Sequence, residues 1–219
     1  MSRNGFLSKG FPLLLLIAIF LGTIAPISWS EVPEILPLSN PMETGYSVIF
    51  EDGFDDGDAN HWNLPSGWTA VEEDGNWYLR ATPEGMSSLV KPLVRSAYRF
   101  RVDVRLWNGW ATLGYRESYG YYALNVSSAG VSLGRFNGEA DEHLADDDTP
   151  ISTGTWHTVE ISGTLGHIQV FVDGDLRIDC NDLAPWYAGS ITLNAWSGPT
   201  AHVDFDNVQV LVPVSYTHL

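Results

Sequence analysis

Residues 97–107 read Ala-Tyr-Arg-Phe-Arg-Val-Asp-Val-Arg-Leu-Trp, and apolar and polar side chains alternate along this stretch. Successive side chains of a β-strand point to opposite faces, so a period of two residues indicates a strand with one buried face. The stretch therefore predicts a strand that lies against a hydrophobic core. The residues expected on its buried face are Tyr98, Phe100, Val102, Val104 and Leu106.

Eleven further segments are short, rich in β-branched and aromatic residues, and separated by Gly, Asn or Asp, which is the pattern of antiparallel strands. The pair Asp173-Gly174 between two of them predicts a tight hairpin. So many strands in one domain predict two stacked antiparallel sheets, that is, an all-β jelly-roll sandwich. The segments are residues 47–50, 69–72, 76–81, 110–116, 121–126, 131–136, 157–162, 167–172, 176–180, 190–196 and 202–212.

Residues 1–30 have the layout of a secretory signal peptide. Arg3 and Lys9 precede an apolar run over residues 11–25, and the small residues Ser28 and Ser30 follow it. A membrane-spanning helix needs about 20 apolar residues, which is longer than this run. We expect cleavage after Ser30, and hence a secreted or extracellular protein with no membrane insertion after cleavage. The alternative is an uncleaved N-terminal anchor.

The domain is expected over residues 46–213. Residues 31–45 contain three prolines and no regular period, which predicts an extended linker. Residues 214–219 read Val-Ser-Tyr-Thr-His-Leu, break the strand pattern, and resemble the translated adapter of a sequencing library. We expect that these residues are an artefact and that the natural chain continues beyond Pro213 into further domains of a larger extracellular protein. A genuine short tail is the alternative.

The charge of the chain limits its partners. The net charge is −16, and without Arg3 and Lys9 nine basic residues remain against 27 acidic ones, which gives −18. Such a charge repels nucleic acid and anionic membranes. A neutral glycan or a divalent cation is compatible with it. The single cysteine, Cys180, allows no internal disulfide bond.

Four short motifs stand out: Phe50-Glu51-Asp52-Gly53-Phe54 leading to Trp62, Trp156-His157-Thr158-Val159, Val170-Phe171-Val172-Asp173-Gly174, and Asp204-Phe205-Asp206-Asn207-Val208. Together they resemble the concanavalin A-like lectin and glucanase superfamily, and most closely its laminin G-like and 3-keto-disaccharide hydrolase-like branches. The resemblance implies two curved antiparallel sheets that hold a ligand, in most members a glycan, on or beside the concave sheet. The fold alone does not decide between lectins, binding modules and glycosidases.

No catalytic residue is predicted. The laminarinase-type glycosidases of the superfamily use the motif E-x-D-x-x-E on one strand, because retaining chemistry needs two carboxyl groups about 5 to 5.5 Å apart. The nearest string, Glu139-Ala140-Asp141-Glu142-His143, lacks the last Glu. It lies in a polar stretch that runs to Asp148, and residues 139–148 are interpreted as a solvated loop. His157 is interpreted as structural, and no serine or cysteine has the context of a nucleophile.

A candidate binding face follows from the alternation within three strands. A sugar needs aromatic platforms beside planar hydrogen-bonding groups, and small Gly114 and Ala123 would leave a trough between them. Arg135 joins this face only if a bulge shifts its strand. Alternatively, Trp110 and Trp196 pack under loops and Arg116 pairs with an acid. The predicted ligand-binding residues are Trp110, Arg116, Tyr121, Asn125, Asn194 and Trp196.

A structural Ca²⁺ site is predicted from Glu51, Asp52, Asp204 and Asp206. Calcium takes six to eight oxygen ligands, and the resemblance implies that the first and last strands pair and bring these acids together. The alternative is that both acidic runs only form turns.

The sequence therefore favours a secreted, noncatalytic carbohydrate-binding module whose partner is a glycan or oligosaccharide. A sugar-active hydrolase or lyase of the 3-keto-disaccharide hydrolase-like type is a second reading. An extracellular adhesion or sensor domain that binds protein is the third.

Overall fold

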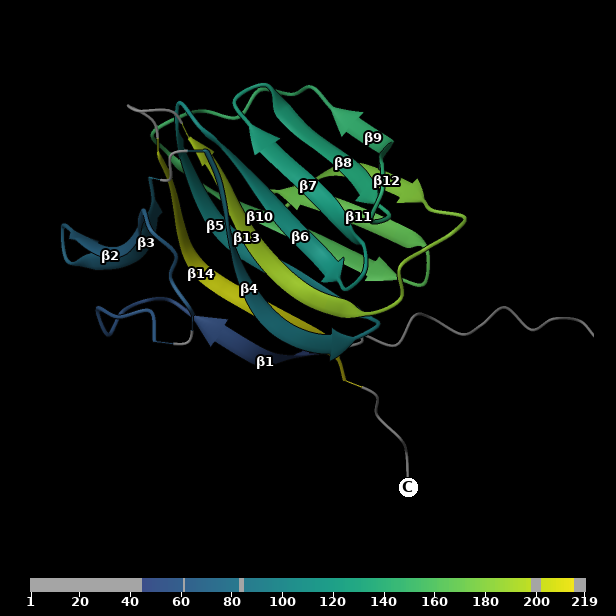
Figure 1. Ribbon diagram of the computed structural model, residues 1–219, viewed down its shortest axis with the longest axis horizontal. Coiled ribbons are helices and arrows are strands. Elements are labelled where there is room, and N and C mark those ends of the chain that lie inside the picture. The colour runs from purple at the N-terminus through teal and green to yellow at the C-terminus, as the bar shows by residue number, and fades with distance from the viewer. Residues whose placement is uncertain (1–44, 61, 83–84, 198–201, 215–219) are drawn as a thin grey trace, which may run out of the picture. The chain divides into compact units, whose positions relative to one another are not determined.

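The computed structural model describes residues 45–60, 62–82, 85–197 and 202–214. Among these residues, fourteen β-strands form two antiparallel sheets. Figure 1 shows the two sheets as layers, with β13, β6, β7 and β8 side by side in front of β5, β10 and β11. The predicted all-β jelly-roll sandwich is confirmed. The predicted signal peptide, nearly all of the linker and residues 215–219 lie outside the described residues.

The eight-stranded sheet is centred on the stretch 97–107. Its strands, in spatial order, are β12 (Asp175–Asn181), β11 (His167–Val172), β10 (Trp156–Thr164), β5 (Tyr98–Trp107), β14 (His202–Pro213), β3 (Asn76–Ala81) and β2 (Trp68–Glu73), with β1 (Tyr46–Asp52) also paired to β14.

The six-stranded sheet lies opposite. Its strands, in spatial order, are β4 (Gly85–Arg95), β13 (Gly189–Ser197), β6 (Trp110–Glu117), β7 (Tyr121–Ser127), β8 (Gly130–Phe136) and β9 (Asp141–Asp147).

The hydrophobic core fills the space between the sheets. On β5 the apolar positions 98, 100, 102, 104 and 106 are at most 2% exposed, as the alternation predicts. The facing strands contribute Leu113 and Tyr115 from β6, Leu124 from β7 and Leu193 from β13, all fully buried. Because each strand buries every second residue, its remaining side chains point to the outer faces of the sandwich.

Two strands were not predicted from the sequence. The interpretation of residues 139–148 as a loop is wrong over Asp141–Asp147, because β9 pairs with β8 along this stretch. β4 pairs with β13 although it contains Pro92. Both are edge strands of the described sheet, and proline and exposed polar residues are tolerated at an edge because one side of the strand needs no backbone partner.

The predicted Asp173-Gly174 hairpin is confirmed. Asp173 and Gly174 have φ angles of 54° and 84°, so both adopt the left-handed conformation of a type I′ turn between β11 and β12. Within the described part of the chain, no helix is long and apolar enough to span a membrane.

Candidate functional site

The outer face of the six-stranded sheet is built from rows of side chains that cross the strands. Antiparallel pairing places Trp196 beside Trp110, Asn194 beside Thr112, and Thr192 beside Gly114. The same register continues these rows onto β7 and β8. Two rows with hydroxyl, amide or very small side chains are thereby placed between Trp110 at one end and Tyr121 at the other.

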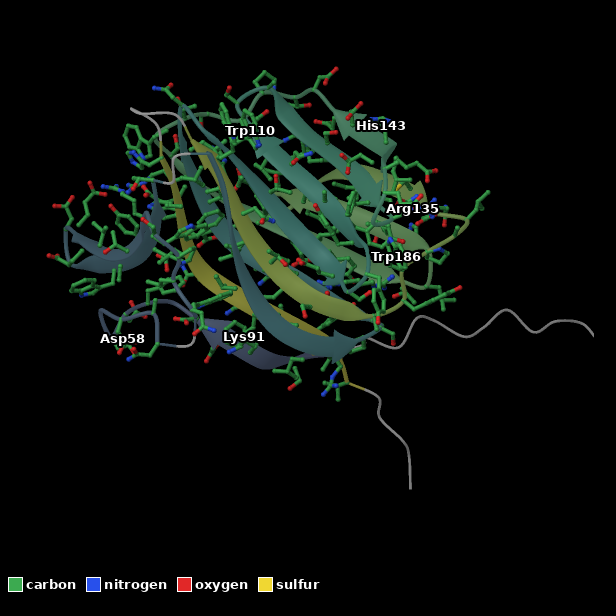
Figure 2. The ribbon with its side chains drawn as sticks, in the orientation of Figure 1. Asp58, Lys91, Trp110, Arg135, His143 and Trp186 are labelled. Carbon is green, nitrogen blue, oxygen red and sulfur yellow. The ribbon has the colours of Figure 1, made fainter. Side chains whose placement is uncertain are left out.

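Trp110 and Trp196 form a stacked pair at one end of this face. Their ring centroids lie 4.0 Å apart and their planes differ by 14°. Each side chain remains 38% exposed. Figure 2 shows Trp110 at the opposite end of β6 from Trp186, which lies beyond the last residues of that strand. The indoles of Trp110 and Trp196 support each other across the neighbouring strands β6 and β13.

A hollow of about 600 Å³ lies on this face and is called the trough below. Ala123 and Gly134 are neighbours in its middle, and a Cβ atom added at Gly134 would meet one backbone oxygen at 3.4 Å. The floor is therefore low where the small residues meet. The residues that line the trough are Trp110, Thr112, Tyr121, Ala123, Asn125, Ser127, Ser132, Gly134, Asp141, Glu142 and His143.

The row beside the tryptophan pair carries the hydrogen-bonding groups. Asn194 Nδ2 donates to the carbonyl oxygen of Thr112 at 3.2 Å. Thr112 Oγ1 in turn donates to Asn125 Oδ1 at 2.6 Å. This orients Asn125, whose side chain is exposed in the trough. The predicted residues Trp110, Tyr121 and Asn125 thus line one hollow, while Trp196 and Asn194 support it from the next strand.

Arg116 is not on this face, and its predicted place in the patch is wrong. A β-bulge interrupts the pairing of β6 with β13 between Tyr115 and Glu117, and Arg116 has a φ of 58°. The extra residue reverses the alternation, so the arginine points inward and is fully buried. The alternative that it pairs with an acid is also wrong, because its guanidinium donates to four backbone carbonyls.

Glu117 takes the outward position that the bulge takes away from Arg116. Its Oε2 accepts a hydrogen bond from Thr192 Oγ1, and a Cβ atom at Gly114 would lie 3.3 Å from the same oxygen. Burial raises the pKa of Glu117 above its ordinary value. Burial also raises the pKa of Tyr121, with smaller contributions from the charges of Asp141 and Glu117. Sequence reasoning missed Glu117 because the bulge leaves no mark in the residue pattern.

Replacing Glu117 with Gln should change the pH dependence of stability. Because burial raises the pKa of the folded state above that of the unfolded chain, ionisation destabilises the folded protein. The pKa of Glu117 in the unfolded chain is about 4. As pH rises from this value through the raised pKa of the folded state, the unmodified protein therefore loses stability relative to Glu117→Gln. Urea unfolding of both proteins across this pH range should show Glu117→Gln gaining stability toward neutral pH. A difference that is constant with pH would contradict this assignment.

Acidic residues of β9 form one side of the trough. Glu142 is paired with Arg135, which also donates to Asp182 Oδ1 at 2.7 Å and is only 13% exposed. The bulge in the β8–β9 pairing adds Leu144 to β9, whereas β8 pairs with β7 without a shift. Arg135 therefore keeps its inward parity and does not join the binding face, and these acids hold it. His143 Nε2 lies 2.7 Å from Asp146 Oδ2. The β9 side of the trough, called the rim below, therefore offers carboxylates, and the guanidinium of Arg135 is already paired.

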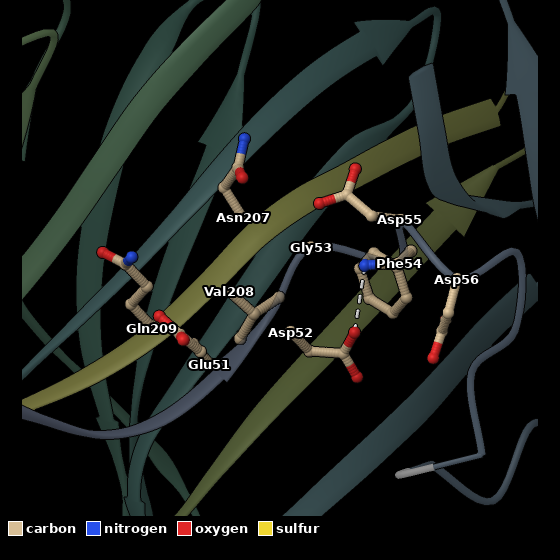
Figure 3. A pocket seen from close by; sticks show the side chains of 9 residues that line it. All are labelled: Glu51, Asp52, Gly53, Phe54, Asp55, Asp56, Asn207, Val208 and Gln209. Carbon is tan, nitrogen blue, oxygen red and sulfur yellow. Dashed lines mark hydrogen bonds between the residues drawn. The ribbon is translucent and has the colours of Figure 1, made fainter. Parts of the chain in front are cut away.

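The four acids predicted to bind calcium do not converge. β1 and β14 pair as expected, but the register places Glu51 beside Gln209 and Asp52 beside Val208. Asp52 accepts a bond from the Trp62 indole at 2.9 Å. It also accepts one from the Phe54 backbone N–H at 3.0 Å (Figure 3). Farther along β14, where this strand pairs with β3 and β5, Asp204 is fully buried between two arginines.

Asp204 and Asp206 accept hydrogen bonds from other side chains of the eight-stranded sheet. Asp204 Oδ1 accepts from Arg80 Nε at 2.8 Å, and its Oδ2 accepts from Arg105 Nε at 3.0 Å. Asp206 accepts a bond from Asn76, and burial raises its pKa. Among the described residues, no group of three or more His, Cys, Asp or Glu side chains is placed to hold a metal ion. Calcium binding therefore stays a prediction.

A separate hollow of about 420 Å³ lies where β1 ends (Figure 3). Glu51, Asp52, Asp55 and Asp56 line it together with Asn207. Asp52 accepts bonds from the Trp62 indole and the Phe54 backbone, so it fastens the end of β1 to the segment that follows it.

Ser152, His157 and Asp173 lie in line on the other side of the sandwich. His157 Nε2 is 2.8 Å from Ser152 Oγ, and its Nδ1 is 2.7 Å from Asp173 Oδ2. However, Nε2 also lies 3.1 Å from the carbonyl oxygen of Ser152, which accepts only from an N–H group. A nitrogen that donates there cannot act as the base for the serine. The histidine fastens the start of β10 to the hairpin, in agreement with its structural interpretation.

Solved structures with the same fold include proteins of several kinds. The carbohydrate-binding module CBM66 from Bacillus subtilis has 21% sequence identity and a TM-score of 0.54 over 66% of this chain and 94% of its own. A Bacillus subtilis protein with a galectin-like fold has 11% identity and a TM-score of 0.62, covering 78% and 99%. The laminarinase from Rhodothermus marinus has 15% identity and a TM-score of 0.57, covering 80% and 100%. These likenesses confirm the fold.

Comparison with curated proteins found no match. The sequence model of one family, however, matches residues 49–211, which include almost every described strand. The resemblance to the concanavalin A-like superfamily and to its 3-keto-disaccharide branch is thereby confirmed. The chain belongs to the family of 3-keto-alpha-glucoside-1,2-lyase-like domains.

Proposed function

We propose that this chain is a secreted, noncatalytic carbohydrate-binding module that holds a glycan in the trough of the six-stranded sheet. The observation that carries the proposal is the exposed Trp110, supported by Trp196, beside a row of oriented amide and hydroxyl groups. Secretion is supported by the signal-like residues 1–30.

The chemistry of the trough matches that of a sugar. A pyranose ring has an apolar C–H face, which stacks on an aromatic ring, and hydroxyl groups at its edge, which need donors and acceptors. Trp110 offers the ring, and Asn125 and Ser132 offer polar groups a short distance away on β7 and β8. The low floor at Ala123 and Gly134 leaves space for the ligand.

The charge of the rim favours a glycan without acidic groups. Asp141 and Glu142 line the trough, and Arg135 is engaged by Glu142 and Asp182. A uronate or sulfate group would meet carboxylates with no guanidinium to pair with, which is unfavourable in a partly buried site. The proposed ligand is therefore a neutral glycan.

The comparisons support a sugar ligand. One protein of similar fold is a carbohydrate-binding module by name and another is a laminarinase. The family to which the chain belongs is named after an enzyme that acts on a glucoside.

A sugar-active lyase or hydrolase is the second candidate function. Glu117 favours it, because a carboxyl group with a raised pKa beside Tyr121 is suited to proton transfer. The two candidates differ in one observable, which is the release of products from a bound glycan.

Replacing Trp110 with Ala should weaken glycan binding at least about tenfold, because the stacking platform is lost. Isothermal titration calorimetry would use soluble β-1,3-glucan, β-1,4-glucan, β-1,4-mannan, β-1,4-galactan and levan, with chromatography of each mixture to detect products. Trp196→Ala should weaken binding less than Trp110→Ala, and Trp196→Phe should restore part of the loss, since Trp196 acts by supporting Trp110.

The matched control is Trp107→Ala. Trp107 is 39% exposed on the other sheet and stacks on His202, so its exposure and environment resemble those of Trp110. Binding should survive this change. Binding that tolerates Trp110→Ala, or no binding to any of the five glycans, would contradict the proposal, and products in the mixtures would favour the lyase or hydrolase.

A further inference from the structure

We infer that the ligand is an extended oligosaccharide whose chain runs parallel to β7, and that the site is not a pocket for a single sugar. This inference rests on the proposed function, since it concerns the same trough. It adds the size of the ligand and its direction across the sheet.

The lining residues show that the long axis of the trough follows β7. The outward residues of β7 line it from one end of the strand to the other, at positions 121, 123, 125 and 127. β6 and β8 contribute two residues each, Trp110 with Thr112 and Ser132 with Gly134. With a rise of about 3.3 Å per residue, six residue steps along β7 span about 20 Å. This length exceeds that of one sugar ring.

A wall stands at each side of the trough over part of its length, which favours a chain along β7 over one across the strands. On the β6 side, the stacked indoles of Trp110 and Trp196 stand at 38% exposure above the sheet, at the level of Ser127. On the other side, Glu142 and His143 of β9 line the trough. An ion pair with Arg135 holds Glu142, and a hydrogen bond with Asp146 holds His143. A glycan that crossed the strands near Ser127 would have to pass over the indoles, and one that crossed nearer Tyr121 would have to pass over the β9 residues.

The end of the trough near Ser127 continues into a second, smaller hollow. This hollow of about 110 Å³ shares Asn125, Ser127 and Ser132 with the trough and extends to Asp146 and Asp148. At the other end, Tyr121 packs against Phe136, with ring centroids 5.4 Å apart. An aromatic contact is thus present near both ends, with the polar row between them.

This arrangement predicts how affinity depends on glycan length. A disaccharide can engage Trp110 and Asn125, whereas a longer oligosaccharide also reaches Tyr121. In the unmodified protein, affinity should rise at least about tenfold from the disaccharide to the hexasaccharide, which corresponds to one additional aromatic contact. Calorimetry would use disaccharide-to-hexasaccharide series of the same five glycans.

Two variants locate the ends of the bound chain. Tyr121→Ala should weaken the hexasaccharide about tenfold and change disaccharide affinity less than about twofold. Trp110→Ala should weaken every length. Tyr121→Phe keeps the ring and should bind as the unmodified protein does, which controls for folding.

The outcomes separate this inference from the proposed function. If no series binds, both are wrong. If disaccharide and hexasaccharide bind equally, or if Tyr121→Ala leaves hexasaccharide affinity unchanged, the glycan does not extend along β7, while the proposed function stands.

Discussion

Replacing Arg116 with Met should lower the free energy of unfolding by about 4 kcal/mol, because this arginine is a fully buried cation that holds three separate turns together. Its Nη1 donates to the carbonyl oxygens of Leu165 and Trp186 at 2.7 and 2.8 Å. Its Nη2 donates to those of Ser96 and Gly163 at 2.5 and 2.7 Å. Methionine fills similar space but leaves four acceptors without this donor, and a buried unsatisfied group costs about 1 to 3 kcal/mol.

The measurement is urea unfolding followed by tryptophan fluorescence. Arg101→Met is the matched control, because Arg101 is 38% exposed and its partner Glu160 also contacts Arg99. Glu160 is only 7% exposed but keeps its contact with Arg99, so the control should lose less than Arg116→Met, about 1 to 2 kcal/mol. Arg116→Lys keeps the charge but has one donor nitrogen, so it should fold with about half the loss of Arg116→Met. Equal losses for Arg116→Met and Arg101→Met would show that the four carbonyl bonds do not stabilise the fold.

The strands that face the core could be predicted from the sequence because burial leaves a period of two. β3 over residues 76–81 and β11 over residues 167–172 have the predicted bounds. β5 follows its alternation from Tyr98 to Leu106 without interruption. In each case one face meets the hydrophobic core, so the residue pattern records the structure.

β9 could not be predicted in this way. Its sequence, Asp-Glu-His-Leu-Ala-Asp-Asp, has four exposed residues and none that is fully buried. Backbone hydrogen bonds to β8 make it a strand, and backbone bonding leaves no requirement on side-chain type. The side of the trough that β9 forms was missed for the same reason.

The prediction placed Arg116 on the outer face, but Glu117 lies there instead, and this difference has another cause. Alternation holds along β6 up to Tyr115, and the residue at a φ of 58° then reverses it. A left-handed arginine is uncommon and has no sequence signal of the kind that glycine supplies. The four acids predicted to bind calcium do not come together because of register: pairing of β1 with β14 was expected, but its alignment of Glu51 with Gln209 was not.

Replacing Ala123 with Trp should reduce glycan binding at least about tenfold, because the indole would fill the lowest part of the trough between Gly114 and Gly134. Ala123 points away from the core and is partly exposed, so the larger side chain can extend outward without disturbing the packing between the sheets. The fold should therefore be kept, and thermal unfolding should occur within a few degrees of that of the unmodified chain.

The most direct test of the trough as the glycan site compares Ala123→Trp with Gln169→Trp by titration calorimetry. Gln169 is also partly exposed, but it points outward from β11 of the other sheet. For the best-bound of the five glycans, we predict at least about tenfold weaker binding for Ala123→Trp and unchanged binding for Gln169→Trp. Unchanged binding in a folded Ala123→Trp protein would contradict the placement of the site on the six-stranded sheet.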